Sequence, residues 1–485
     1  MSYQHGISVV ENSPSLKATV ATSGVQVVVG TAPVHLLVDP KSAVNQPIVA
    51  YSLEDVKRKL GYSKNFSKFT LCESAYASFE LLKVAPVIFI NVLDPDKHKK
   101  SVTAKTISVA NKMATIDAEG VLLETVVVKS SGGGTTTYVK NQDYTISFDD
   151  KGKPVILVLS SGAASAESAL TVEYSELDAT LVTDEDIIGG YDSATGAYSG
   201  IGLVLQVHPR FGIVPGQLLA PGWSHRPLVA AVLSAKAEKI NGNFNAQAIL
   251  DIDSETVRQH EKVAEWKETN NYNAPKSIVL WPKVKNGENI LWYSAIFAAR
   301  TAKLDADNED VPFKSPSNKD LPIDAAVLPD GTEIYLDQPQ ANSLNAAGVV
   351  TALNWNGWKT WGNNMAVFPN VVNPQDQFIS VRRMLDWWGN TFILSYFDKV
   401  DNPLDTRLIE SVVDSENIRA NGYQARGQIA GAKIEFRKDM NPDDQILKGK
   451  IIFNQKIGAF GPAEHIQNML EFDPTIVSAA ILGGE

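Results

Sequence analysis

The chain has 485 residues, which is too long for one ordinary hydrophobic core, so we expect roughly two to four domains. Hydrophobic residues make up 44% and charged residues 20%, a globular composition that excludes a largely disordered chain. The net charge of −11 argues against a nucleic-acid partner, because phosphate binding requires a dominant basic face.

Two further features concern the cellular compartment. Residues 1–20 lack the basic run followed by an apolar run that marks a secretory signal, and no stretch of about 18 apolar residues predicts a membrane anchor. The single cysteine, Cys72, cannot form an intrachain disulfide and suits a reducing compartment. Its apolar neighbours on a predicted helix favour a core thiol.

The N-terminal part has an α/β pattern. Residues 7–9 alternate in polarity, which predicts a small strand on an exposed arm. Residues 25–30 and 87–92 are apolar, β-branched runs typical of strands buried on both faces. Between them, Ser52 is placed to cap a short helix, and a longer helix is predicted over 71–82.

Residues 97–186 differ from their surroundings. Thr, Ser and Val dominate, and short alternating runs are separated by turn-forming segments at 132–134 and 149–152. The pattern predicts a small all-β domain inserted into the α/β one.

After residue 187 the alternation of strands and helices returns. We expect strands at 218–220, 248–251 and 277–284, with helices at 226–239, 254–267 and 290–303. A Pro- and Asn-rich stretch at 311–329 breaks the pattern. A last α+β unit begins near residue 361, with helices at 378–388 and 405–417, strands at 432–437 and 447–454, and an apolar tail at 476–482.

A search for catalytic or ligand-binding motifs gives no candidate, so no catalytic residue, metal ligand or cofactor is predicted. The seven histidines are scattered without metal-ligand spacing, and the glycines at 132–134 and 200–202 lack the residues that complete a phosphate-binding loop. No serine stands in a G-x-S-x-G elbow. Trp355, Trp358 and Trp361 could form a stacking platform, but their Asn and Gly neighbours favour a packed or inter-subunit loop.

Several segments in the last third of the chain occur in a characteristic order. They are ISVRRMLD at 379–386, NPLDTRLIE at 402–410, GQIAGA at 427–432 and DMNPDD at 439–444. In this order they resemble the C-terminal domain of contractile tail sheath proteins. Upstream, LAPG at 219–222 and FKSPSN at 313–318 also resemble sheath sequences, whereas 97–186 matches no motif of that family.

The resemblance implies a structural subunit that assembles with copies of itself into sixfold rings, stacked as a helical sleeve around an inner tail tube. Contraction of the sleeve would drive the tube through a target cell envelope, without an enzyme activity. Baseplate and tail-terminator proteins are the other implied partners, and the location is the tail of a virion or tail-like particle assembled in the bacterial cytoplasm. Whether the particle is a phage, a tail-like bacteriocin or another injection device stays open.

The expected fold class is a multi-domain α/β protein, in which an α/β core carries an inserted all-β domain and a C-terminal α+β domain with exchangeable β-strand arms. The expected domains are an N-terminal arm (1–20), a discontinuous core (21–96 and 187–360), an outward-facing insert (97–186), a tube-facing C-terminal domain (361–473) and a C-terminal arm (474–485).

A two-stranded ribbon at 432–454 would be marginal alone, so its open edges could accept strands from other subunits. The residues expected to take part in strand exchange are Ile7, Val9, Val10, Ile434, Phe436, Ile451, Phe453, Ile476, Val477 and Ile481.

Local charge suggests where the tube binds. Residues 421–456 carry more basic than acidic side chains, although the whole chain is acidic. One interpretation is that edge lysines discourage wrong strand pairing. The other is a reversible ionic contact with the tube, with candidates Arg382, Arg383, Lys433, Lys448 and Lys450.

Two other protein classes stay open at this point. A static self-assembling shell or surface-layer protein would also need exchangeable strands and soluble acidic domains. An α/β hydrolase with a β-insert is the third class. Electron microscopy of the purified protein would distinguish the three classes. Wide-bore sleeves would indicate a sheath and flat lattices a shell, whereas discrete particles that turn over a substrate would indicate an enzyme.

Overall fold

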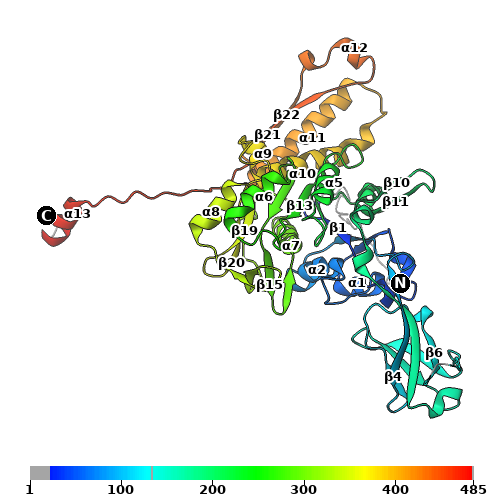
Figure 1. Ribbon diagram of the computed structural model, residues 1–485. Coiled ribbons are helices and arrows are strands. Elements are labelled where there is room, and N and C mark those ends of the chain that lie inside the picture. The colour runs from blue at the N-terminus through cyan, green and yellow to red at the C-terminus, as the bar shows by residue number, and fades with distance from the viewer. Residues whose placement is uncertain (1–21, 133–134, 483–485) are drawn as a thin grey trace, which may run out of the picture.

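The structure is a computed structural model that describes residues 22–132 and 135–482 (Figure 1). Within these residues, an eight-stranded sheet with the order β2-β3-β1-β12-β13-β14-β19-β20 forms the centre. Its inner strands are parallel, and β2 and β20 pair antiparallel at the two edges. The strands are β1 (Gln26–Gly30), β2 (Pro47–Ala50), β3 (Val87–Asn91), β12 (Gln217–Leu219), β13 (Gln247–Asp251), β14 (Ser277–Leu280), β19 (Val349–Asn354) and β20 (Trp358–Trp361).

Helices pack against this sheet. They are α1 (Leu53–Lys59), α2 (Thr70–Ala75), α3 (Asp184–Ile188), α4 (Val207–Phe211), α5 (Pro227–Ala237), α6 (Val263–Thr269), α7 (Tyr293–Ala306) and α8 (Gln338–Ala346). Ser52 accepts a hydrogen bond from the Asp55 N–H at 3.2 Å, as expected of an N-cap. Cys72 is buried in α2, as predicted for a core thiol. The helix predicted at 254–267 begins later, at Val263.

One predicted strand is two strands. The run 277–284 leaves the central sheet after Leu280, because Pro282 has no N–H to continue the hydrogen-bond ladder. Lys283 then begins a separate four-stranded sheet, with the order β16-β15-β17-β18. Its strands are β15 (Lys283–Asn286), β16 (Asn289–Leu291), β17 (Ala325–Val327) and β18 (Glu333–Ile334), and a hairpin of β10 (Gly190–Asp192) and β11 (Ala197–Ser199) lies elsewhere on the core.

Two three-stranded sheets occupy most of the region where an all-β insert was predicted. Their orders are β4-β9-β6 and β5-β8-β7, and they enclose a hydrophobic cluster separate from that of the core. In Figure 1 this unit lies at the opposite end of the molecule from the C-terminal helices. The strands are β4 (Lys99–Ser108), β5 (Met113–Thr115), β6 (Val127–Ser130), β7 (Tyr144–Phe148), β8 (Pro154–Val158) and β9 (Ala169–Leu177).

The C-terminal unit is built on two long helices, α10 (Ile379–Tyr396) and α11 (Thr406–Ala425), preceded by the short α9 (Pro374–Gln377). Trp387 and Trp388 of α10 both meet the ring of Tyr423 on α11, with centroids 5.4 and 5.6 Å apart. This edge-on packing joins the helices. The remaining elements are β21 (Gly431–Phe436), α12 (Asp443–Ile446), β22 (Phe453–Gly458) and α13 (Pro474–Leu482).

One predicted strand boundary in this unit is wrong, and the apolar tail has a different secondary structure in the isolated chain from the one expected in an assembly. The second ribbon strand begins at Phe453 rather than at residue 447, so Ile451 lies before the strand. The apolar tail forms helix α13 instead of a strand, because Asp473 accepts from the Thr475 N–H at 2.8 Å and Pro474 opens the first turn. Residues Ile7, Val9 and Val10 lie outside the described part of the chain.

Candidate assembly surfaces

The β21–β22 ribbon has two unlike edges. On the outer side of β21, the Asn417 side chain from α11 bonds both backbone groups of Ile434. Its Oδ1 accepts from the Ile434 N–H at 3.0 Å, and its Nδ2 donates to the Ile434 carbonyl at 3.2 Å. The Ile434 backbone therefore points away from β22, and Asn417 caps this edge of the ribbon.

The outer edge of β22 is open. Gln455 lies opposite Ile434 in the antiparallel register. Opposed residues in such a pair either bond each other or both point outward, so the backbone groups of Gln455 point away from β21. Within the described residues no partner bonds them. An unpaired strand edge of this kind is a template for another strand.

The ribbon residues predicted for strand exchange take different positions. Ile434 is buried beneath the ribbon, and Phe436 and Phe453 pair across it with ring centroids 6.1 Å apart. Ile451 lines an apolar cavity of about 370 Å³ beside the start of β22, together with Phe392, Leu408 and Phe453. The start of β22 therefore adjoins an apolar depression.

The C-terminal segment leaves the body of the molecule. Residues 459–473 contain no helix or strand, and Figure 1 shows them running outward to α13. Ile466, Leu470 and Ile481 are 86%, 91% and 76% exposed. Ile476 and Val477 of α13 are exposed as well. A contiguous exposed apolar segment indicates a surface that is covered in an assembly.

The three lysines predicted to contact the tube are on the surface. The side chains of Lys433 and Lys448 are 76% and 62% exposed, and each has only an exposed carboxylate partner, Glu435 at 4.0 Å and Asp444 at 3.4 Å. Lys450 is exposed too. Exposed ion pairs of this kind contribute little to stability, so these ammonium groups stay available to a partner.

The two arginines predicted beside them have a different role. Arg383 is buried, with 1% of its side chain exposed, and its guanidinium binds both oxygens of the equally buried Asp305 at the end of α7. It therefore cannot reach a tube in this conformation, and that part of the prediction is wrong. Sequence alone could not reveal the pairing, because Asp305 is distant along the chain.

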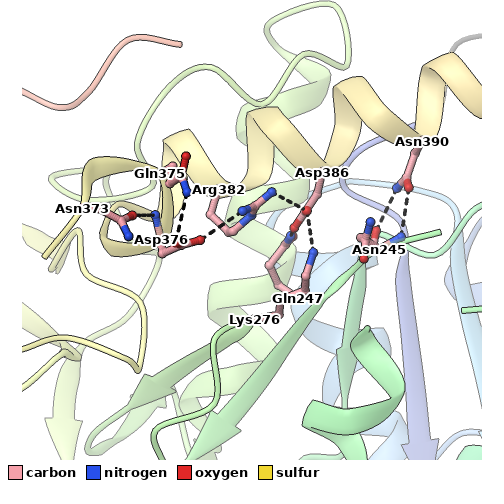
Figure 2. Close-up of polar contacts among 9 residues, drawn as sticks. All are labelled: Asn245, Gln247, Lys276, Asn373, Gln375, Asp376, Arg382, Asp386 and Asn390. Atoms are coloured by element: carbon pink, nitrogen blue, oxygen red, sulfur yellow. Dashed lines mark hydrogen bonds and ion pairs between the residues drawn. The ribbon is translucent and has the colours of Figure 1, made fainter. Parts of the chain in front are cut away.

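Arg382 belongs to a polar network that fixes α10 to the central sheet (Figure 2). It bonds Asp376 at 3.2 Å and Asp386 at 2.9 Å, and Asp386 also accepts from Lys276 at 2.6 Å and Gln247 at 2.9 Å. Lys276 and Gln247 lie where β14 and β13 begin, so α10 crosses the amino ends of these strands. The i, i+4 spacing of Arg382 and Asp386 was the visible signal for their pair.

The buried polar residues of the core are arranged for structure. Ser224 and Ser294 both donate to the Asp251 carboxylate, so neither hydroxyl is bonded to a histidine base. Burial raises the pKa of Asp251 to about 6. In the described residues, no group of three or more His, Cys, Asp or Glu is placed to hold a metal ion, and no helix is long and apolar enough to cross a membrane.

The tryptophan series does not form a platform. Trp358 is buried and its indole N–H donates to the Asp324 carbonyl at 2.8 Å, whereas Trp355 is exposed. Trp361 donates to the Asn342 side chain at 3.0 Å. Trp358 and Trp361 thus lie on strand β20, whereas Trp355, in the loop between β19 and β20, is left on the surface.

Comparisons with known proteins agree on one class. No protein-family profile matches the chain. The tail sheath protein of Burkholderia phage BcepMu is 27% identical over 481 residues, covering 96% of this chain and 95% of that protein. A putative prophage major tail sheath protein of Pseudomonas aeruginosa is 27% identical over 293 residues, covering 58% of this chain and 70% of its own length.

Solved structures show the same fold at low identity. The sheath of the PVC extracellular contractile injection system in its contracted state has a TM-score of 0.58, is 13% identical and covers 98% of this chain and 99% of that chain. The sheath tail protein of Desulfitobacterium hafniense has a TM-score of 0.51, is 11% identical and covers 94% of this chain and 100% of that chain.

The fold is thus that of the sheath proteins of contractile injection systems. By sequence, the chain is similar to the BcepMu tail sheath protein over nearly its whole length, so the predicted resemblance to tail sheath proteins is confirmed. These relatives are structural proteins and not enzymes, which confirms the prediction of a non-enzymatic chain.

Proposed function

We propose that the chain is the sheath subunit of a contractile tail, polymerising as stacked sixfold rings around an inner tube and shortening to drive that tube through a target cell envelope. The near full-length match to a phage tail sheath protein supports the class. The surfaces of this chain support the mode of assembly.

The observation that carries the proposal is the pairing of an open edge with an unsupported tail. The edge of β22 at Gln455 has unbonded backbone groups, and residues 459–482 expose apolar side chains without a local core. An extended segment the length of 459–473 reaches about 50 Å, enough to contact another subunit. A helix as short as α13 is marginal in water, so the tail can refold as a strand when it meets an open edge.

The N-terminal residues Ile7, Val9 and Val10 are proposed as a second donor, since they form the other short β-capable segment of the sequence. Donated strands link subunits by backbone hydrogen bonds, while the connecting segments let the subunit bodies move. Such links would hold the sleeve together during contraction.

The charge and the shape of the subunit support a proposed orientation in the sleeve. Lys433, Lys448 and Lys450 are proposed to face the tube, with ionic contacts that release readily. The β4–β9 insert lies at the other end of the molecule (Figure 1), so it would face outward. Baseplate and terminator proteins would cap the sleeve, in a particle assembled in the host cytoplasm.

Contraction needs no nucleotide in this scheme. An extended sleeve assembled on the tube and baseplate would be held in a packing of higher free energy than the contracted one. Release at the baseplate would let the rings change packing one after another. The energy would be stored during assembly.

The role of the C-terminal tail in assembly can be tested by substituting one exposed apolar residue at a time with aspartate. Ile466→Asp and Leu470→Asp place a carboxylate on the exposed tail, and Val38→Asp places one on an equally exposed site of the core. We expect all three variants to fold by circular dichroism, and both tail variants to remain unpolymerised by electron microscopy and sedimentation while Val38→Asp forms sleeves. Sleeves from both tail variants would contradict the proposal.

A further inference from the structure

A solvent-accessible cavity of about 620 Å³ lies where the central sheet meets the β-insert. Thr31 follows the end of β1, and Gly222 and Trp223 follow the end of β12, and all three line it. Strand β3 lies on one side of β1, and β12 with the later parallel strands lies on the other. Parallel α/β sheets bind ligands at such a switch point, beyond the carboxyl ends of the strands.

The lining of this cavity is strongly basic although the chain is acidic. One carboxylate, Asp178, faces four cations that come from both the core and the insert: Lys68, Lys100, Arg226 and Lys283. The volume is within the range of small-molecule sites. The charge indicates that an anion fits it.

The four cationic side chains differ in whether they already have a hydrogen-bond or ion-pair partner. Lys100 pairs with Glu176 at 3.0 Å, Arg226 pairs with Asp184 at 2.6 Å, and Lys68 donates to the Glu119 carbonyl at 3.0 Å. Lys283 has no hydrogen bond to any described residue and no carboxylate within 4 Å, although Glu73 and Asp251 act on it electrostatically from farther away. Its side-chain nitrogen lies 3.8 Å from the ring centroid of Trp292. The N–H donors of Lys283 that do not face the Trp292 ring are therefore available to a ligand.

The surroundings of Lys283 are fixed. The ring of His225 stacks on Trp292 at 4.7 Å, and Glu73 accepts the Trp292 backbone N–H. Burial raises the pKa of Glu73 well above its ordinary value and lowers the pKa of Lys283. Burial thus favours the neutral forms of both groups, and an anion in the cavity would restore the charged form of the lysine.

The glycine at 222 keeps the cavity open. Its φ of +80° is a left-handed conformation, and an added Cβ would lie 3.0 Å from Thr70 Cγ2 and 3.4 Å from Trp292 Nε1. A larger residue would therefore be strained and would push toward the wall that carries Trp292.

We propose that this cavity binds a small oxyanion with two or more negative charges, of the phosphate or pyrophosphate class, held by Lys283 and Arg226 of the core and Lys100 of the insert. The ligand would join the core to β4 and stabilise the attachment of the insert. This site is independent of the ribbon, the tail and the proposed tube contacts.

The test is calorimetric titration of the soluble full-length chain at low salt with pyrophosphate, phosphate and citrate. We expect pyrophosphate to bind more tightly than phosphate, and to raise the melting temperature. Lys283→Met should weaken pyrophosphate binding about tenfold or more, because a charged hydrogen-bond donor is lost. Lys285→Met, a half-buried lysine on the same strand outside the cavity, should bind as the parent does.

Lys100→Met supplies a second variant on an exposed side chain, in case Lys283→Met does not fold. It should also weaken binding. Tighter citrate than pyrophosphate binding would assign the site to carboxylates and overturn the phosphate class. No heat at about 1 mM pyrophosphate, or equal losses in Lys283→Met and Lys285→Met, would overturn the site itself. Loss of sleeves in Lys283→Met without anion binding by the parent would instead assign the cavity to a carboxylate of a neighbouring subunit.

Discussion

Arg383 on α10 and Asp305 at the end of α7 form a buried ion pair that joins the C-terminal unit to the core. Arg383 Nη1 lies 3.1 Å from Asp305 Oδ1, and Ser23 Oγ donates to Asp305 Oδ2 at 2.7 Å. Because Ser23 is the second residue that the structure describes, the same carboxylate also holds the beginning of the described chain against α7.

Removing the arginine should therefore be costly. Arg383→Met leaves the Asp305 charge buried without its partner, and we expect the free energy of unfolding to fall by about 3 to 5 kcal/mol in urea titrations. Arg407→Met, on an exposed helix position, is the matched control and should change stability by less than about 0.5 kcal/mol. Equal effects of the two changes would contradict the role of the pair.

His35 should make the protein sensitive to acid. It is buried between the rings of Phe69 in the core and Phe148 in the insert, and burial lowers its pKa from 6.5 to about 3. Between these values the unfolded chain binds a proton that the folded chain does not. The His35 contribution to stability is thus complete above pH 6.5 and is lost as the pH falls toward 3, by up to about 5 kcal/mol.

The corresponding variant is His35→Phe, which removes the titrating group and two unbonded ring nitrogens. We expect it to raise the unfolding midpoint at pH 5 more than at pH 8. His465→Phe, on the exposed tail, should not change the pH dependence. The same gain for His35→Phe at both pH values would show that its protonation does not limit stability.

Asp251 should change the pH dependence of folding stability in the opposite direction to His35. Its pKa is raised from 3.8 to about 6, so between these values the folded chain binds a proton that the unfolded chain does not. Its contribution to stability falls as the pH rises from 4 to 6, by about 3 kcal/mol. Relative to Asp251→Asn, the parent should lose stability over that range in denaturant titrations. A constant difference between the two proteins would contradict the raised pKa.

The proposed tube contact depends on surface charge. Lys433→Glu with Lys448→Glu should weaken co-sedimentation with isolated tubes and remove its dependence on salt, because screened ionic contacts are lost. Lys151→Glu, an exposed lysine of the insert, should leave tube binding unchanged. Binding by the double variant equal to that of the parent at low salt would place these lysines away from the tube.

The sequence predicted the buried strands well and the ribbon poorly. Residues 25–30 and 87–92 are apolar because both faces of the sheet are covered, which makes the pattern unambiguous. At 447–452 a mixed run of Leu, Lys, Gly and Ile follows Pro442, Asp443 and Asp444, which begin α12, and Gly449 has a φ of +74° just after that helix. These are helix-end signals, and they outweigh the β-propensity of the run.

For the candidate assembly surfaces, the sequence predicted the region of the chain but not which of its charges and strand edges are free. The basic surplus in 421–456 led to Lys433 and Lys448, which the structure shows to be exposed, but the partner of Arg383 is brought near only by the fold. The capping of the β21 edge could not be predicted either, because nothing in the sequence distinguishes Asn417 from any other polar residue of a helix. Contacts distant in sequence decide which charges and edges stay free.

The central claim is that subunits are joined by strand addition at the open edge of β22, and one substitution tests it most directly. Gln455→Pro removes the outward N–H that an added strand would bond, without removing a hydrogen bond between β21 and β22. Gln455→Ala keeps that N–H and loses the same side-chain contact to Glu416, so it is the matched control. In electron micrographs of the purified proteins, we predict sleeves from the alanine variant and folded, unpolymerised subunits from the proline variant. Sleeves from Gln455→Pro in the same yield would contradict the account.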